Sequence, residues 1–416
     1  MYFVPWSASR EGTMGSEDNA AEPLPSPGSV PPRVGTYLYP WDLIGDPEAV
    51  PRLMGAGFDQ VTVAAAYHSV RAATPQHPQH RFVVAETAAL YRPIRDSVWG
   101  ARRLTPLGAV WTGSDDSFRR AVEALDASGV SVSAWVVLTH NSSLGRTHPD
   151  LVVTNCFRDS YEYALCPANE EVREYAALLA SEAVRDLPLA GVSLEACGQL
   201  GAAHRGHHDK SSGAYTPLAE KILSVCCCAA CRRGWSIRGF DTGAVVRALR
   251  EGFESAMGDA DVDASPADVL GAQLAAQLLG LRHTHTDALL NDVLAALGEA
   301  NPSLAISLHA QTDPWATGAS PGLTQSSARH VNSVLVPVEA MSPDSSNIIA
   351  TTRQSVPAGV GVTAYVNLLA PIEPDDFDAH AQRLLNAGAD ALELYHFGIA
   401  NRSQLPLFAA LASASG

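Results

Sequence analysis

The chain has 416 residues, a formal net charge of −16 and 46% hydrophobic residues, enough for one large core. Acidic charge without a basic patch argues against nucleic acid or an anionic membrane surface as a partner. No apolar run reaches the roughly 18 residues of a membrane span, and the N-terminus lacks the basic and apolar parts of a secretory signal, so a cytoplasmic location is expected.

Taken in order, the chain begins with a segment unlike the rest. Residues 1–32 are rich in Pro, Ser, Gly and acidic residues, and are predicted to be a disordered tail. Residues 33–416 are predicted to form a single domain.

Eight apolar segments in that domain are predicted to be strands, and they alternate with segments of helical pattern. The predicted strands are 34–42, 58–68, 129–141, 189–198, 304–311, 333–341, 360–371 and 390–398, and the predicted helices are 47–57, 114–128, 169–186, several within 216–300, and 402–414. This α/β pattern predicts a (β/α)8 TIM barrel with long βα loops and a helical insertion after the fourth strand. An open doubly wound sheet is the main alternative, but PWDLIGDP after the first strand is not a Gly-rich phosphate-binding turn.

Polar residues fall near the C-terminal ends of the predicted strands, the face on which TIM barrels build active sites. Glu195 is the first candidate, because it ends an apolar strand, LAGVSLEACG, where a buried carboxylate is costly unless it is used. The residues at these strand ends are Asp42, His68, His140, Glu195, His309, Glu339, Asn367 and Glu393.

Several motifs between residues 130 and 235 are similar to those of a known protein family. They are AWVVLTHN, HPD, NCFRDSYEYALCPANEEVREY, GVSLEACG and HRGHHDK followed by LSVCCCAAC. Together they resemble a family of largely uncharacterised glycoside-hydrolase-like barrel proteins. The resemblance implies a barrel over most of 34–414 and a carbohydrate-active function.

Glycosidic bond cleavage usually needs two carboxyl groups, one to protonate the leaving oxygen and one to attack the sugar or activate water. By analogy with barrel glycosidases, Glu195 is predicted to be the general acid/base. Glu339 and Glu393 compete as the second carboxylate, with Glu339 slightly ahead. Asn367 stands where the strand-seven nucleophile is usual, which leaves a retaining or an inverting mechanism open.

A further set of polar and aromatic residues is predicted to bind the substrate, because flat rings cover sugar faces while carboxylates and imidazoles bind hydroxyls. This set is Tyr37, Trp41, Asp42, His68, His140, Asn141, His204, His207, His309, Asn367, Tyr395 and His396. The structural alternative is that the rings are core residues, the histidines are hydrogen-bonded rim residues and the glutamates are paired with arginine.

No cofactor or metal is expected. Cys226, Cys228 and Cys231 include one CxxC without a second, so they are interpreted as reduced, packed thiols rather than as a zinc site. The histidine-rich stretch from His204 to Asp209 lacks the HExxH spacing and is interpreted as a substrate loop.

The resulting hypothesis is a glycoside hydrolase acting on a small glycoside. Two alternatives remain open: a metal-dependent barrel hydrolase, isomerase or lyase, and a non-catalytic sugar-binding barrel. The oligomeric state, including a homo-oligomer, is also open.

Overall fold

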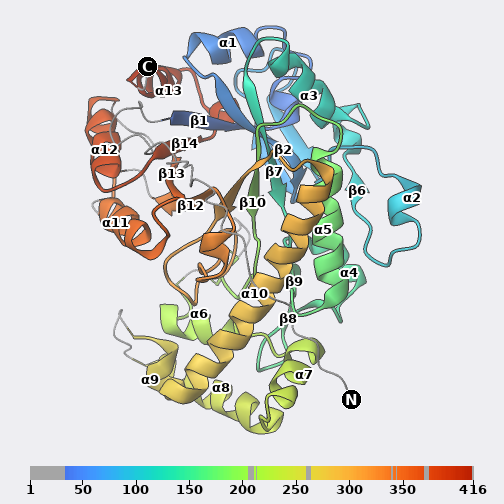
Figure 1. The fold of residues 1–416 in the computed structure, drawn as a ribbon, viewed down its shortest axis with the longest axis vertical. Coiled ribbons are helices and arrows are strands. Elements are labelled where there is room, and N and C mark those ends of the chain that lie inside the picture. The colour runs from blue at the N-terminus through green and yellow to red at the C-terminus, as the bar shows by residue number, and fades with distance from the viewer. Residues whose placement is uncertain are drawn as a thin grey trace, which may run out of the picture. The chain divides into compact units, whose positions relative to one another are not determined.

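The computed structural model describes residues 33–204, 210–211, 213–258, 264–338, 341–342, 344–369 and 374–414. Eight parallel strands form a closed barrel, in which β1 pairs with both β14 and β2 (Figure 1). The strands are β1 (Arg33–Leu38), β2 (Gln60–Tyr67), β7 (Ser131–Val137), β10 (Gly191–Glu195), β11 (Ala305–His309), β12 (Ser333–Val338), β13 (Gly361–Asn367) and β14 (Ala391–Tyr395). The predicted TIM barrel is confirmed. Residues 1–32, the expected tail, lie outside the described residues.

The barrel strands are apolar because they are buried on both faces. In β2, every residue after Gln60 is buried, and the sequence VTVAAAY supplies β-branched and small side chains. Seven helices follow the barrel strands: α1 (Ala49–Gly55), α3 (Ser117–Asp126), α5 (Glu170–Val184), α10 (Ala272–Ala300), α11 (Ser345–Ser355), α12 (Pro374–Asn386) and α13 (Leu405–Ala414). The predicted alternation fails once, because only the short 3-10 helix η3 (Ser327–Arg329) separates β11 from β12 in the described chain.

The two long βα loops carry secondary structure of their own. The loop after β2 contains the antiparallel hairpin of β3 (Val70–Ala73) and β4 (Phe82–Ala85), followed by β5 (Ala89–Leu90), α2 (Asp96–Trp99), β6 (Leu107–Gly108) and η2 (Val110–Thr112). The loop after β7 contains α4 (Ser142–Thr147) and an antiparallel hairpin of β8 (Val152–Thr154) and β9 (Ser160–Leu165). The β8–β9 hairpin was not predicted from the sequence.

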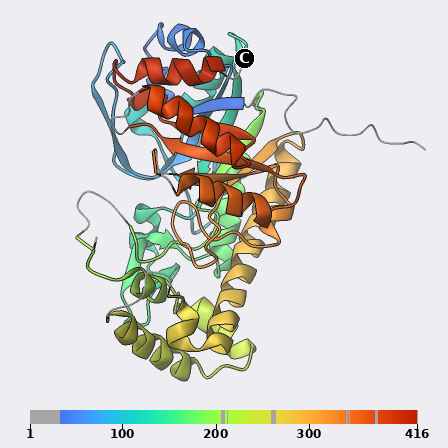
Figure 2. The same cartoon turned by 90° about the vertical axis from the view of Figure 1, so that its left-hand side faces the viewer.

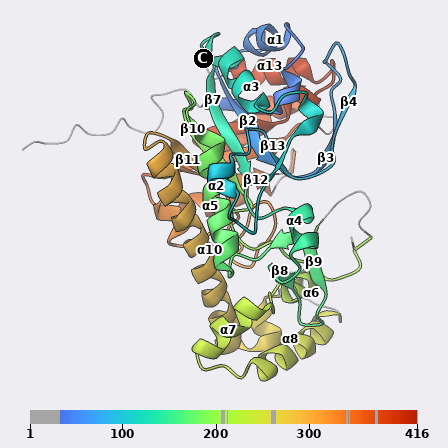
Figure 3. The ribbon, with the colours of Figure 1, turned by 90° about the vertical axis from the view of Figure 1, so that its right-hand side faces the viewer.

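The helical insertion after β10 is confirmed. It contains α6 (Pro217–Leu223), α7 (Ala229–Ile237), α8 (Thr242–Ala256) and α9 (Pro266–Leu270), which gather around one end of α10 (Figure 2). The long helix α10 then runs beside α5 (Figure 3). Its Leu278 and Leu281 pack in the core of the insertion, whereas Leu289 and Val293 pack in the barrel core, so this one helix joins the two cores. No helix in the described part of the chain is long and apolar enough to cross a lipid bilayer.

Candidate active site

Side chains from three strands meet inside the barrel. The Tyr37 hydroxyl of β1 lies 2.9 Å from Ser193 Oγ of β10 and 3.2 Å from His309 Nε2 of β11. Burial lowers the pKa of His309 to about 3, so its ring is neutral at neutral pH. Tyr37 and His309, both predicted to bind substrate, therefore belong to one interior hydrogen-bonded group. Their contact with substrate stays a prediction.

Glu195 is the last residue of β10 and is only 7% exposed. Its Oε2 accepts a hydrogen bond of 2.7 Å from Trp135 Nε1 on the neighbouring strand β7. Burial raises the pKa of Glu195 from 4.5 to about 7, although the Trp135 hydrogen bond acts in the opposite direction. The carboxyl group can therefore hold a proton close to neutral pH, as a general acid must.

The turn after Glu195 is held in a conformation that is rare for alanine. Ala196 has a φ of +53°, in the left-handed region. Its N–H donates to Ala319 O at 2.8 Å, and Thr139 Oγ1 donates to the carbonyl oxygens of Ala196 at 2.7 Å and Gly198 at 3.0 Å. These bonds fix the backbone directly after the carboxylate.

Aromatic rings surround the Trp135–Glu195 pair. The Trp135 ring lies 4.4 Å from Tyr67, 4.7 Å from Tyr37 and 6.2 Å from Tyr395 between centroids. Tyr365 lies 5.0 Å from Tyr37. Sequence analysis selected Tyr37 and Tyr395 but missed three members of this group. The missed residues are Tyr67, Trp135 and Tyr365. Trp135 aligns with Ser193 in the parallel register of β7 and β10, a pairing that only the structure gives.

Glu393 lies deeper than the end of its strand. It precedes Tyr395, the last residue of β14, by two positions, and it aligns with Gly35 of β1. A Cβ atom at Gly35 would overlap the Glu393 carboxyl group, which explains the glycine. Oε2 of Glu393 is buried without a hydrogen-bond partner among the described residues, and burial raises the pKa of this group to about 8. Glu393 is therefore mostly protonated at neutral pH.

This carboxyl group makes stability depend on pH. Its pKa rises from 4.5 to about 8 on folding, so its contribution is intact below pH 4.5 and is lost as pH rises through 8. Glu393→Gln, which carries no charge, is expected to increase the free energy of unfolding at pH 9 by roughly 3 to 5 kcal/mol relative to the unchanged protein, and not at pH 4. Urea unfolding at both pH values measures this. Glu182→Gln is the control, because buried Glu182 is paired with Arg95 and should gain nothing. Equal effects of Glu393→Gln at both pH values would contradict the account.

Three of the predicted histidines come together. The rings of His68 and His140 lie 4.5 Å apart, and His140 Nε2 lies 3.1 Å from His204 Nε2. Burial lowers the pKa of His68 to about 4. Burial, together with the neighbouring rings of His68 and His204, lowers the pKa of His140 well below its ordinary value. At least two of these rings are thus neutral hydrogen-bonding groups at neutral pH.

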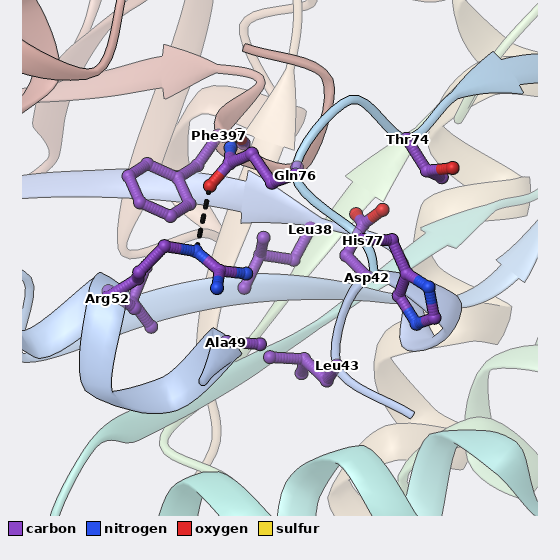
Figure 4. A pocket seen from close by; sticks show the side chains of 11 residues that line it. Leu38, Asp42, Leu43, Ala49, Arg52, Thr74, Gln76, His77 and Phe397 are labelled. Atoms are coloured by element: carbon purple, nitrogen blue, oxygen red, sulfur yellow. Dashed lines mark hydrogen bonds between the residues drawn. The ribbon is translucent and has the colours of Figure 1, made fainter. Parts of the chain in front are cut away.

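Asp42 lies beside His396, another predicted residue, and also lines a small pocket of its own. Its Oδ2 accepts from the N–H of Tyr39 at 2.7 Å and lies 4.0 Å from His396 Nε2. Burial raises the pKa of Asp42 to about 7. Figure 4 shows its carboxylate facing a small pocket with Leu38, His77 and other residues, none of which sequence analysis predicted for the site. The Tyr39 ring stacks on the rings of both Trp41 and His396.

The side chains of two predicted asparagines accept hydrogen bonds from backbone N–H groups two or three residues further along the chain. Asn141 Oδ1 accepts from Leu144 N at 3.0 Å and caps α4, while its Nδ2 donates to Tyr175 Oη at 3.2 Å. Asn367 is exposed at the end of β13, and its Oδ1 accepts from Leu369 N at 3.0 Å. Their role in substrate binding stays a prediction. Glu339 and His207 lie outside the described residues.

Comparison with known proteins identifies structural counterparts. No family profile and no curated protein sequence matches the chain. A β-galactosidase from Bacillus circulans sp. alkalophilus superposes with a TM-score of 0.54 and 11% identity, over 92% of this chain and 55% of that one. A GH42 β-galactosidase from G. stearothermophilus gives 0.55 and 11%, over 92% and 56%. The catalytic domain of a β-amylase from Paenibacillus polymyxa gives 0.53 and 10%, over 93% and 100%.

The shared feature is the barrel. These counterparts are TIM-barrel glycoside hydrolases. At this identity the likeness shows the fold alone, and the chain spans little more than half the length of either β-galactosidase.

Outside the barrel interior, four buried cysteines form a cluster. Cys166, which follows β9, joins Cys226, Cys228 and Cys231, and their sulfur atoms all lie within 4.8 Å of one another. Cys166 Sγ lies 3.7 Å from Cys231 Sγ and 3.8 Å from Cys228 Sγ. A tetrahedral zinc site with Zn–S bonds near 2.3 Å has sulfur atoms about 3.8 Å apart, so the four thiols fit Zn²⁺ without rearrangement.

The thiols of the cluster share their protons unequally. Hydrogen bonds from the neighbouring thiols, that of Cys166 first, lower the pKa of Cys228, whereas hydrogen bonds within the same cluster raise the pKa of Cys166 and of Cys231. Metals are bound by thiolates rather than thiols. The sequence interpretation as packed thiols rested on the lack of a second CxxC and did not include Cys166, which the structure adds to the group.

Proposed function

We propose that this protein is a glycoside hydrolase in which Glu195 is the general acid. One observation carries the proposal: a buried carboxyl group at the C-terminal end of a barrel strand, bonded to Trp135 Nε1 and with its pKa raised to about 7. A carboxylic acid that stays protonated near neutral pH can protonate the leaving oxygen of a glycosidic bond. The barrel shared with enzymes named β-galactosidase and β-amylase supports the same reaction class.

The neighbouring residues have distinct tasks in this proposal. The Trp135 N–H orients the Glu195 carboxyl and stabilises the carboxylate that remains after proton transfer. The buried rings of Tyr37 and Tyr67 give the Glu195 carboxyl a low-dielectric environment, and the partly exposed ring of Tyr395 can pack against the apolar face of a sugar.

We assign the second carboxylate to Glu339. In sequence, it directly follows Val338, the last residue of β12, whereas Glu393 lies two residues before the end of its strand. The raised pKa of Glu393 also leaves it mostly uncharged at neutral pH, which is unfavourable for a nucleophile or base.

The geometry gives less support to the metal-dependent alternative. In the part of the chain that the structure describes, the cysteine cluster is the one group of at least three His, Cys, Asp or Glu side chains with ligand atoms close enough to share an ion. His68, His140, His309 and Glu195 do not converge in this way.

A panel of nitrophenyl glycosides tests the proposal directly. At least one member is expected to be hydrolysed, and kcat/KM is expected to fall as pH rises through about 7, because Glu195 then loses its proton. Binding of sugars without turnover of any glycoside, natural oligosaccharides included, would favour the non-catalytic barrel instead.

The hydrogen bond from Trp135 yields a sharper pH prediction. Trp135→Phe removes the group that lowers the pKa of Glu195, so the alkaline limb of the kcat/KM profile is expected to move up by about one pH unit. Trp99→Phe removes a buried indole that contacts Tyr175 rather than Glu195, and should leave the limb in place. A limb that stays in place or moves down in Trp135→Phe would remove Glu195 as the acid.

A further inference from the structure

A cavity of about 400 Å³ lies between the β8–β9 hairpin and the helical insertion. Five aromatic residues line it: Phe157, Tyr161, Tyr163, Tyr215 and Phe253. Its volume lies in the usual range for a small-ligand site. The hairpin region contacts both α6 and α8, because the Tyr161 hydroxyl donates to Leu223 O at 3.0 Å and the Phe157 ring lies 5.2 Å from that of Phe253 (Figure 3).

Two of the five rings at this cavity are exposed, and the other three are partly buried. Phe157 is 36% exposed and Tyr215 is 39% exposed, and both rings contact Phe253, at 5.2 and 5.8 Å between centroids. Tyr161 and Tyr163 stack 5.9 Å apart, with ring planes 11° from parallel. Exposed aromatic side chains gathered around a hollow mark a binding surface, because they gain contact area only when a partner covers them.

The polar groups of the cavity define the charge of its ligand. Asp159 and Glu254 line it, and among the residues that the structure describes no Lys or Arg belongs to the lining, although the Arg250 guanidinium lies 5.4 Å from the centroid of the lining Phe157 ring. Asn155 Nδ2 donates to Asp159 Oδ2 at 3.0 Å and to the Tyr161 hydroxyl at 3.1 Å, so these groups are held in place before a ligand arrives. Carboxylates accept hydrogen bonds from hydroxyl groups and repel anions. The chemistry therefore excludes an anionic ligand, and it suits a hydroxyl-rich ligand with a flat apolar face, which describes a neutral sugar.

A continuous series of rings connects this cavity with Glu195. It runs through Tyr163, His204, His140, His68, Tyr67 and Trp135. Adjacent centroids lie 4.1 to 5.1 Å apart, and the last ring donates the hydrogen bond to Glu195. The series runs from the cavity to the buried rings beside Glu195, of which Tyr67 is 6% and Trp135 1% exposed, so the cavity and the carboxyl group lie at the two ends of one aromatic cluster.

We infer that this aromatic cavity is a distal subsite that binds a neutral sugar unit of an oligosaccharide whose scissile bond lies at Glu195. The inference rests on the proposed function and names its substrate class: an oligosaccharide rather than a small glycoside. The cavity binds the remote unit, and that binding energy holds the bond to be cleaved at the acid.

Truncation of the exposed rings tests the inference. The variants are Phe157→Ala and Tyr215→Ala, and the substrates are neutral gluco- and galacto-oligosaccharides of increasing length beside nitrophenyl monosaccharides. For the longer oligosaccharides kcat/KM is expected to fall about tenfold or more, and for the monosaccharides it is expected to stay unchanged. Tyr215→Phe keeps the ring and should keep the activity. Phe82→Ala, which removes a 55% exposed ring on β4, is the matched control.

A second readout separates failure of this inference from failure of the proposed function. Binding of the same oligosaccharides is measured by calorimetry in Glu195→Gln and in Glu195→Gln with Tyr215→Ala. Length-dependent binding that the added Tyr215→Ala weakens supports the subsite even if no glycoside is hydrolysed. Hydrolysis whose dependence on chain length is the same in Tyr215→Ala and in the unchanged protein overturns the subsite while the hydrolase stands.

Discussion

Glu195→Gln is expected to lower kcat by about 10²–10⁴-fold and to leave the barrel folded, because glutamine keeps the shape of the side chain but cannot donate the proton. The amide can still accept the hydrogen bond from Trp135 Nε1. Steady-state kinetics on the best glycoside, with circular dichroism to verify folding, measures the effect. Substrates with good leaving groups, such as dinitrophenyl glycosides, should lose less activity, since their leaving oxygen needs little protonation.

The other two carboxylates provide the comparison. Glu339→Gln is expected to lose activity on all substrates, including those with good leaving groups, because its role does not depend on the leaving group. The Glu393→Gln variant is expected to keep most of the activity. Glu393 is already mostly protonated at neutral pH, and it lies two residues before Tyr395, the last residue of β14. Full turnover in Glu195→Gln would remove Glu195 from the mechanism. Loss in Glu393→Gln with full activity in Glu339→Gln would reverse the assignment of the second carboxylate.

The cysteine cluster is expected to bind one zinc ion per chain. Loss of that zinc ion is expected to lower the free energy of unfolding by at least about 3 kcal/mol. The physical reason is that four cysteine side chains whose sulfur atoms lie within 4.8 Å of one another are preassembled, and can bind the metal as thiolates, only in the folded state. Elemental analysis of the purified protein measures the zinc, and urea unfolding of Cys166→Ser measures the loss of stability.

Cys156→Ser is the matched control, because Cys156 is also buried but lies outside the cluster. If Cys166→Ser and Cys156→Ser destabilise equally and no zinc is found, the cluster is a group of packed thiols. The cluster also links Cys166, directly after β9, to the start of α7, so metal loss should loosen the hairpin that carries Tyr161 and Tyr163. Binding of long oligosaccharides should then suffer more than hydrolysis of monosaccharide substrates.

The sequence by itself determined the barrel and the first catalytic candidate. Each barrel strand is a short apolar segment, and this pattern is local, so it can be found without knowledge of the fold. Glu195 stood out for the same reason, as a carboxylate at the end of a buried strand. Eight such segments with intervening helices leave few architectures open, which is why all eight strands were predicted.

Only the tertiary structure decided which of these side chains share a site. Glu195 and Glu393 both occur near strand ends, but the register of β14 against β1 places Glu393 beside Gly35, deeper in the barrel. Cys166 lies sixty residues from Cys226, and the short β8–β9 hairpin that brings them together has too little periodicity to be predicted. Register, strand depth and contacts between distant segments depend on how the whole chain packs, because side chains far apart in sequence become neighbours only after the barrel closes.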